Sequence, residues 1–375
     1  MKPFYRLKID EHDIYHKCDS YTLERINEHI EYRRYNRFVD WHQNIIITLV
    51  EEKDFQQNVS KMWLEIENTG GETARISIAD IGVTYEAATV KLNYFTSDWG
   101  SEYTPQSQII DNEFIFGSLS GRSSKGFSPF CSVDYDNQNF SMAIAYSGNW
   151  ECCNAKFFDN RYYSTMGINR VEFFTDLKSN QTFSTPYVLV TSEKNQELST
   201  LNLRRYFKKH LSLLSDKDER FSPMPVSFNH WWPYEDKHID EDVFYENSKV
   251  AKDLGLRYAM LDAGWFGEES ALNTWYEKRG DWSTINEVRF KSGIKALFEK
   301  VSNLGIKPGI WCEIEAVGRY AKLNDTHSHI IAKRNGNSLG YVCFGNHKGI
   351  EWAMGIVDTL LGEYNAKWIK FDFNL

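Results

Sequence analysis

The feature that most constrains the fold is a change of sequence pattern between about residues 200 and 225. Before the change, runs of β-branched and aromatic residues alternate polar and apolar positions, which is typical of half-buried antiparallel strands. The clearest of these runs cover residues 44–52, 61–68, 74–86 and 185–192. We therefore expect residues 1 to about 198 to form a large β-sandwich.

After the change, apolar strands alternate with helices. We expect strands at residues 225–229, 257–261, 306–311 and 367–371, with helices at 241–254, 294–304 and 350–364. This alternation indicates parallel βα units, arranged either as a doubly wound sheet or as a (β/α)8 barrel. No glycine-rich phosphate-binding motif follows any of these strands, which argues against the nucleotide-binding versions of the architecture.

A helix and a linker mark the boundary between the two patterns. The helix is predicted over residues 201–214, where four apolar residues recur at helical spacing: Leu203, Phe207, Leu211 and Leu214. Residues 215–225 are polar and interrupted by prolines, as linkers often are. We therefore predict a sandwich domain with a closing helix over residues 1–215 and a second domain over residues 221–375.

The composition excludes several classes of protein. A net charge of −9 does not suit binding to nucleic acids or to anionic membranes. No stretch is apolar over the length of a transmembrane helix, and the first residues carry charges where a signal peptide needs its apolar segment. The six cysteines show no paired spacing, which indicates reduced thiols in a cytoplasmic protein without a zinc site.

Aromatic residues are abundant, at 15% of the chain, and most of the 12 tryptophans lie after residue 230. Two interpretations stay open here. Large β cores rich in aromatic residues would account for the figure. A carbohydrate site would also account for it, because the apolar face of a sugar ring packs well against a flat aromatic ring.

Polar and aromatic residues follow each of the four expected parallel strands. They read NHWW at residues 229–232, DAGW at 262–265, WCEIE at 311–315 and KFDFN at 370–374. A single Asp after a strand could simply cap the next helix. Four such ends in a row favour an active site, since the carboxyl ends of parallel barrel strands converge on one face.

These strand ends resemble the motifs of glycoside hydrolase family 36, the α-galactosidase (melibiase) family. The family's LDDGWFG, WFEPE and KWDMN correspond here to LDAGWFG at residues 261–267, WCEIE at 311–315 and KFDFN at 370–374. Shorter matches are PVSFNHW at 225–231, GDW at 280–282, and, in the sandwich half, GRSSKGFSPF at 121–130 and YSGN at 146–149. The resemblance runs from about residue 95 to the end. It implies a β-supersandwich followed by the first four βα units of a (β/α)8 TIM barrel.

The resemblance also implies a retaining glycosidase whose nucleophile is Asp372. A nucleophilic carboxylate must stay ionised, and Lys370, two residues away on the same face of the strand, would lower its pKa. Lys370 and Asn374 also carry donors for sugar hydroxyls. A second carboxyl about 5–5.5 Å from the nucleophile should act as acid and base.

Further site residues follow from the same resemblance. Asp262 matches a carboxylate that binds galactose hydroxyls, and Trp311 and Trp231 match tryptophans that line the sugar site. Glu313 and Glu315 have two open interpretations, as sugar contacts or as structural partners of a Lys or Arg. No metal or cofactor is implied, because glycoside hydrolysis needs only two carboxyls.

The chain departs from the family pattern in two ways. Ala263 replaces the second Asp of the strand-two pair, which in the family holds hydroxyls of the bound sugar. The enzyme should therefore prefer a sugar that lacks or repositions the hydroxyl facing Ala263, or should bind galactose weakly, unless Ala263 points away or Glu268 fills the gap. The chain also ends at Leu375, whereas the family's acid/base Asp lies on a later strand. We therefore expect the N-terminal part of a longer enzyme, with negligible α-galactosidase activity by itself.

The function predicted is thus an α-galactosidase-type hydrolase acting on terminal α-galactosides of oligosaccharides or glycoconjugates. An α-N-acetylgalactosaminidase or a galactosyl transferase of the same family would carry the same motifs. A carbohydrate-binding fragment without turnover is the alternative from another class. The resemblance further implies a homo-oligomer of the full-length form, by analogy alone.

Overall fold

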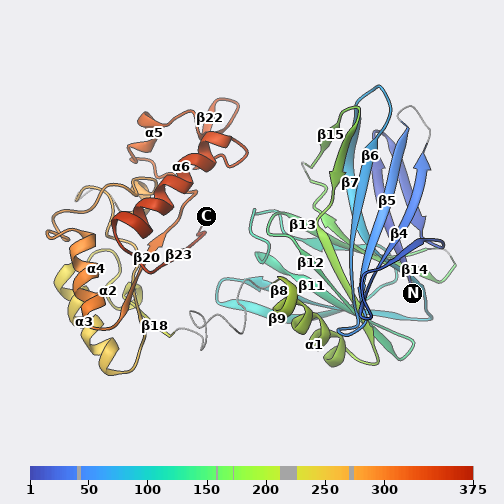
Figure 1. The fold of residues 1–375 in the computed structure, drawn as a ribbon, viewed down its shortest axis with the longest axis horizontal. Helices are drawn as coiled ribbons and strands as arrows, with labels where there is room; N and C mark the ends of the chain where they lie inside the picture. The colour runs from blue at the N-terminus through green and yellow to red at the C-terminus, as the bar shows by residue number, and fades with distance from the viewer. Residues whose placement is uncertain (40–43, 158, 172, 212–225, 270–273, 375) are drawn as a thin grey trace. The chain divides into compact units, whose positions relative to one another are not determined.

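The computed structural model describes residues 1–39, 44–157, 159–171, 173–211, 226–269 and 274–374. The chain divides into two compact units, Met1–Ser215 and Asp216–Leu375. The first unit consists almost entirely of β-strands, and the second alternates strands and helices (Figure 1). None of the helices in the described ranges has the length and apolar character needed to cross a membrane.

The first unit contains two antiparallel sheets. The seven-stranded sheet has the order β10 (Phe114–Gly117), β13 (Trp150–Lys156), β14 (Arg161–Ile168), β7 (Ala74–Glu86), β1 (Lys2–Ile9) and β2 (His12–Lys17), with β15 (Thr175–Leu177) also paired to β7. The ten-stranded sheet has the order β3 (Thr22–Arg25), β4 (Ile30–Val39), β5 (Ile45–Asp54), β6 (Val59–Asn68), β17 (Tyr187–Glu193), β12 (Gln138–Ala145), β11 (Gly126–Tyr135), β8 (Val90–Asp98) and β9 (Ser101–Ile109), with β16 (Gln181–Ser184) paired to β6.

The two sheets share one apolar core, which makes this unit a sandwich. The core contains Leu7 and Ile81 from the seven-stranded sheet together with Leu49, Leu64 and Val133 from the ten-stranded sheet. On β6, from Ser60 to Asn68, the buried positions alternate with more exposed ones, because successive strand side chains point to opposite faces. The four strands predicted for this half are confirmed as β5, β6, β7 and β17.

The helix that follows the sandwich strands differs from its prediction. It begins earlier, as α1 (Gln196–Tyr206), because Asn195 caps its first turn by accepting a hydrogen bond from the Leu198 N–H. A π-helical turn, η1 (Phe207–Leu211), then shifts the face that the helix presents. Leu203 and Tyr206, three positions apart in α1, are buried, whereas Phe207 is 52% exposed, so the predicted apolar stripe is wrong at Phe207. Leu214 and residues 215–225 lie outside the described residues.

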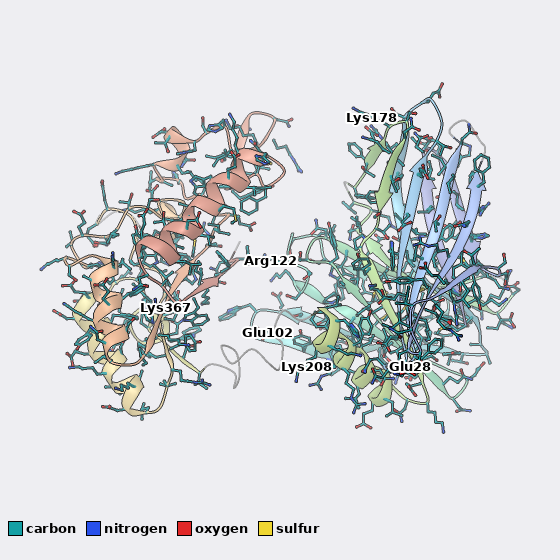
Figure 2. All side chains as sticks on the ribbon, in the orientation of Figure 1. Glu28, Glu102, Arg122, Lys178, Lys208 and Lys367 are labelled. Atoms are coloured by element: carbon teal, nitrogen blue, oxygen red, sulfur yellow. The ribbon has the colours of Figure 1, made fainter. Side chains whose placement is uncertain are left out.

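The second unit is built on four parallel strands in the order β18 (Ser227–Asn229), β19 (Tyr258–Leu261), β20 (Lys307–Cys312) and β23 (Trp368–Phe371). These confirm the four strands expected from the sequence, except that Pro225 lies outside the described residues. Lys367, labelled in Figure 2, precedes β23, and its backbone N–H donates to the Pro308 carbonyl (2.8 Å). That bond helps to set the register in which Trp311 lies beside Lys370.

Helices connect these strands, as parallel pairing requires. The longer ones are α3 (Glu241–Asp253), α4 (Ile294–Asn303) and α6 (His347–Asp358), which continues as the π-helical turn η3 (Thr359–Glu363). Asp240 caps α3 by accepting from the Val243 N–H (2.8 Å). On α4, the spacing of Ile294, Leu297, Phe298 and Val301 places all four on the buried face.

Several short elements in the loops were not expected from the sequence. They are α2 (Trp231–Tyr234), the 3₁₀ turn η2 (Trp275–Lys278), α5 (Leu323–Thr326) and the hairpin of β21 (Ile331–Arg334) with β22 (Asn337–Val342). Each is too short to produce a clear periodic pattern. The sandwich followed by parallel βα units confirms the predicted fold class, with the βα half as a partial barrel.

Candidate active site

The side chains that follow the parallel strands meet at one edge of the sheet, around Asp262. One carboxylate oxygen of Asp262, Oδ2, accepts a hydrogen bond from Asn229 Nδ2 (2.7 Å) and one from Lys370 Nζ (3.0 Å). The Lys370 ammonium also lies 3.5 Å from Asp372 Oδ2. Three strands thus contribute to one hydrogen-bonded cluster, and two of its carboxylates share a single cation.

Asp372 is the more accessible carboxylate, with 32% of its side chain exposed against 5% for Asp262. Its Oδ2 accepts from the Trp311 indole N–H (2.9 Å), and its Oδ1 accepts from the Phe373 backbone N–H (3.0 Å). Partial burial would raise the pKa of Asp372, but the Trp311 hydrogen bond and the Lys370 charge outweigh it, and the pKa is lowered. The carboxylate is therefore held in its ionised form.

The two predicted tryptophans have different surroundings. Trp311 is 1% exposed; its ring stacks on Phe266, with centroids 5.9 Å apart, and meets Trp275 edge-on at 5.3 Å. Its contribution to the site is therefore the indole N–H on Asp372. Trp231 is half-buried and meets Trp275 edge-on at 5.5 Å, which leaves part of its ring accessible.

Glu313 is a structural partner of an arginine, which was one of the two roles considered for it from the sequence. Its Oε2 accepts from Arg279 Nη1 (2.9 Å) in an ion pair whose members are almost fully buried. Its Oε1 accepts from the backbone N–H of Asn374 (2.7 Å). Glu313 therefore anchors the segment that follows Asp372, while the Asn374 side chain acts on Asp372 and helps to lower its pKa.

Ala263 does not face the open side of the cluster. It is 1% exposed and belongs to the apolar core of this unit. Glu268, the residue considered as a substitute for the absent carboxylate, is exposed and pairs with Lys322. The geometry thus agrees with the interpretation in which Ala263 points away, and it does not support Glu268 as a replacement.

No role was assigned from the sequence to Asn229, His230 or Arg279, although residues 229–232 were among the strand ends that indicated an active site. Asn229 bonds directly to Asp262, and the fully buried His230 ring bonds to the backbone on both sides of that residue. The position of Asn229 at the end of its strand was a usable signal, because Asp262 ends the neighbouring strand in the same way. Arg279 gave no such signal, since it lies in a long loop.

Chemically, the arrangement offers an ionised and accessible carboxylate beside a cation and several hydrogen-bond donors. Within the described ranges, no three His, Cys, Asp or Glu side chains gather as ligands for a metal ion. An ionised carboxylate with neighbouring donors suits attack on an electrophilic carbon of a polar, hydroxyl-rich molecule.

Comparison with known proteins gives two family matches. The melibiase family model matches residues 182–375, and the model of the glycosyl hydrolase family 36 N-terminal domain matches residues 33–178. Among curated relatives, α-galactosidase AgaA of Geobacillus stearothermophilus is 24% identical over 334 residues, covering 84% of this chain and 44% of the relative. α-Galactosidase Mel36A of Lactobacillus acidophilus is 30% identical over 221 residues, covering 57% and 29%.

Solved structures support the fold. The crystal structure of AgaA superposes with a TM-score of 0.86 at 19% identity, covering 98% of this chain and 55% of AgaA. Variants of AgaA have also been solved in complex with raffinose and with stachyose. The chain spans less than half the length of the curated relatives that it matches.

Proposed function

This chain belongs to glycoside hydrolase family 36, and on that premise we propose that it carries the nucleophile of a retaining α-galactosidase. The observation that supports this most directly is the state of Asp372. Its carboxylate is ionised and accessible, and it is held between the Trp311 indole and the Lys370 ammonium at the carboxyl edge of a parallel sheet. Family membership and geometry point to the same residue.

In the proposed first step, an Asp372 oxygen attacks the anomeric carbon of a terminal α-galactoside. The bond from that carbon to the leaving oxygen breaks, and the oxygen takes a proton from a second carboxyl. A covalent galactosyl-enzyme results. Water then attacks the same carbon, gives its proton to the second carboxyl and releases galactose with Asp372 restored.

Asp262 is assigned to sugar binding and not to acid/base catalysis. Its oxygens already accept hydrogen bonds from Asn229, Lys370 and the Ala263 backbone N–H (2.9 Å), so they act as acceptors. We assign Lys370, Asn374 and Trp231 to contacts with the galactose ring or its hydroxyls. The acid/base role thus falls to a carboxyl other than Asp262.

The substrate class follows from the relatives. AgaA variants bind raffinose and stachyose, both oligosaccharides, which supports an α-galactoside of this kind as the substrate. The free state of all six cysteines in the structure agrees with the cytoplasmic location proposed from the sequence. The homo-oligomer implied by the resemblance stays a prediction.

The test is covalent trapping with a fluorinated α-galactosyl fluoride. Fluoride leaves without a proton from a general acid, so the nucleophile is tested independently of the acid/base residue. We expect mass spectrometry to find one galactosyl label on the peptide that contains Asp372. The matched control, Asp372→Asn, should take up no label. A label on Asp262 or Glu315 would overturn the assignment.

A further inference from the structure

The Asp262–Ala263 turn is clamped by a histidine that no part of the proposed mechanism uses. His230 follows β18 and is fully buried. Its Nδ1 accepts a hydrogen bond from the backbone N–H of Asp262 (3.0 Å), and its Nε2 lies 3.2 Å from the carbonyl oxygen of Ala263. One ring therefore bonds to the N–H of one residue and to the C=O of the next.

These two contacts define the state of the ring. A backbone N–H can only donate and a carbonyl can only accept, so Nδ1 must carry a lone pair and Nε2 must carry the proton. The neutral Nε2–H tautomer satisfies both contacts. Burial lowers the pKa of His230, against the opposing charge of Asp262, and this agrees with a neutral ring.

The clamp acts on the backbone of Asp262, whereas other residues hold its side chain. Asn229 and Lys370 both donate to Oδ2 of Asp262. The direction of the carboxylate thus depends on two sets of contacts: the bonds from Asn229 and Lys370 to the side chain, and the His230 contacts to the backbone of the turn. A rotation of this turn would move the Asp262 carboxylate away from Lys370, the cation that also lies beside Asp372.

We propose that His230 is a positioning residue, whose neutral ring fixes the Asp262–Ala263 turn so that the Asp262 carboxylate faces the bound sugar. The effect on sugar binding rests on the proposed function, whereas the hydrogen-bond clamp itself does not. His230 does not contact substrate in this proposal, and it acts only through Asp262.

The first experiment tests the clamp in the whole chain without any sugar. In ¹⁵N-labelled, deuterated protein, we expect a coupling across the hydrogen bond between the Asp262 amide nitrogen and His230 Nδ1. The ring nitrogens should show the shifts of the neutral Nε2–H tautomer. A protonated Nδ1, or the other neutral tautomer, would overturn the proposal.

The second experiment measures binding of 1-deoxygalactonojirimycin by calorimetry. His230→Phe keeps a ring of similar size but removes both contacts, and we expect its Kd to rise about tenfold, as loss of positioning hydrogen bonds worth roughly 1.4 kcal/mol would give. His230→Gln, which offers one acceptor and one donor, should recover part of the affinity.

Ser248→Ala is the matched control, because Ser248 is also fully buried and donates to the Phe244 carbonyl (2.7 Å) within α3. It should lower the stability of the same unit without changing the Kd. An equal rise in Kd for Ser248→Ala and His230→Phe would overturn the positioning role. If the wild-type chain does not bind 1-deoxygalactonojirimycin, the proposed function is wrong. The tautomer of His230 found by NMR then still shows whether the ring makes its two hydrogen bonds to the Asp262–Ala263 turn.

Discussion

Each unit of this protein contains a cation that is shared by two carboxylates, and the surroundings of the two cations differ. In the sandwich, Arg6 bonds to Asp80 (Nε to Oδ2, 2.9 Å) and to Glu151 (Nη2 to Oε1, 3.0 Å), and all three side chains are at most 2% exposed. In the parallel-strand unit, Lys370 lies between Asp262 and Asp372, with 39% of its side chain exposed.

The difference lies in what remains available to a ligand. The planar guanidinium of Arg6 directs its fixed N–H groups to Asp80, Glu151 and the Cys153 sulfur, all of them buried, which makes the sandwich cluster a structural element. The Lys370 ammonium is a compact charge on a flexible stem, and both it and Asp372 stay accessible to solvent. Similar charges are therefore enclosed by the fold in one unit and leave an accessible carboxylate in the other.

The largest expected effect is on the rate of galactosyl-enzyme formation, which should depend on the Lys370 cluster and not on the Arg6 cluster. Asp372→Asn should slow galactosyl-enzyme formation by roughly 10⁴-fold or more, because the attacking carboxylate is lost. Its melting temperature should stay close to that of the wild type, since the side chain is partly exposed. Asp80→Asn should leave the labelling rate of the folded protein unchanged. Rapid mixing followed by mass spectrometry measures both labelling rates. Slow labelling of folded Asp80→Asn would show that the two clusters do not differ in their effect on the reaction.

The next effect is on the free energy of unfolding, to which the buried Arg6 cluster should contribute strongly. Arg6→Met leaves Asp80 and Glu151 buried without this cation, and it should lower the free energy of unfolding by about 3–5 kcal/mol. Urea unfolding followed by circular dichroism measures this change. The control is Arg75→Met, which breaks the exposed pair with Asp176 and should change the free energy of unfolding much less, because solvent screens that pair. Equal losses of unfolding free energy in Arg6→Met and Arg75→Met would show that burial does not determine how much an ion pair contributes to stability.

A third prediction concerns Ala263, whose methyl group faces the core. Ala263→Asp places a carboxylate in apolar surroundings and should lower the free energy of unfolding by about 2 kcal/mol or more. Affinity for galactosides should not improve. Ala263→Asn controls for the added size without the charge. A stable Ala263→Asp protein with a tenfold gain selective for galactosides would restore the specificity role expected from the sequence.

The smallest effect is a shift in pH dependence. Since the pKa of Asp372 is lowered, the pH at which labelling by the galactosyl fluoride falls to half should lie below about 3.9, the ordinary pKa of Asp. In Lys370→Met the fall should begin at higher pH, because the neighbouring positive charge is gone. A pH profile that is the same in Lys370→Met as in the wild type would show that Lys370 does not lower the pKa of Asp372.

The same shift has a consequence for folding. A carboxyl whose pKa is lower in the folded than in the unfolded state stabilises the protein above its unfolded pKa. That contribution is lost as the pH falls through the lower, folded value. Acid unfolding should therefore begin at slightly higher pH in Asp372→Asn than in the wild type, which unfolding curves at several pH values measure.

The type and order of the longer elements could be predicted from the sequence, because periods of two and 3.6 residues are local properties of the chain. The sequence also placed Asp262, Trp311 and Asp372 at strand ends, and parallel strands bring their carboxyl ends to one edge. Family motifs then identified Asp372 as the proposed nucleophile. These predictions required no knowledge of which side chains touch.

Only the tertiary structure decided how those residues are partnered. Lys370 bonds to Asp262, 108 positions away in the chain, and Trp311 presents its N–H, not its ring face, to Asp372. The inward direction of Ala263 and the contacts of His230 also depend on how β18 and β19 pair and on the turn that follows. Such contacts are set by packing between distant segments, which leaves no periodic trace in the sequence.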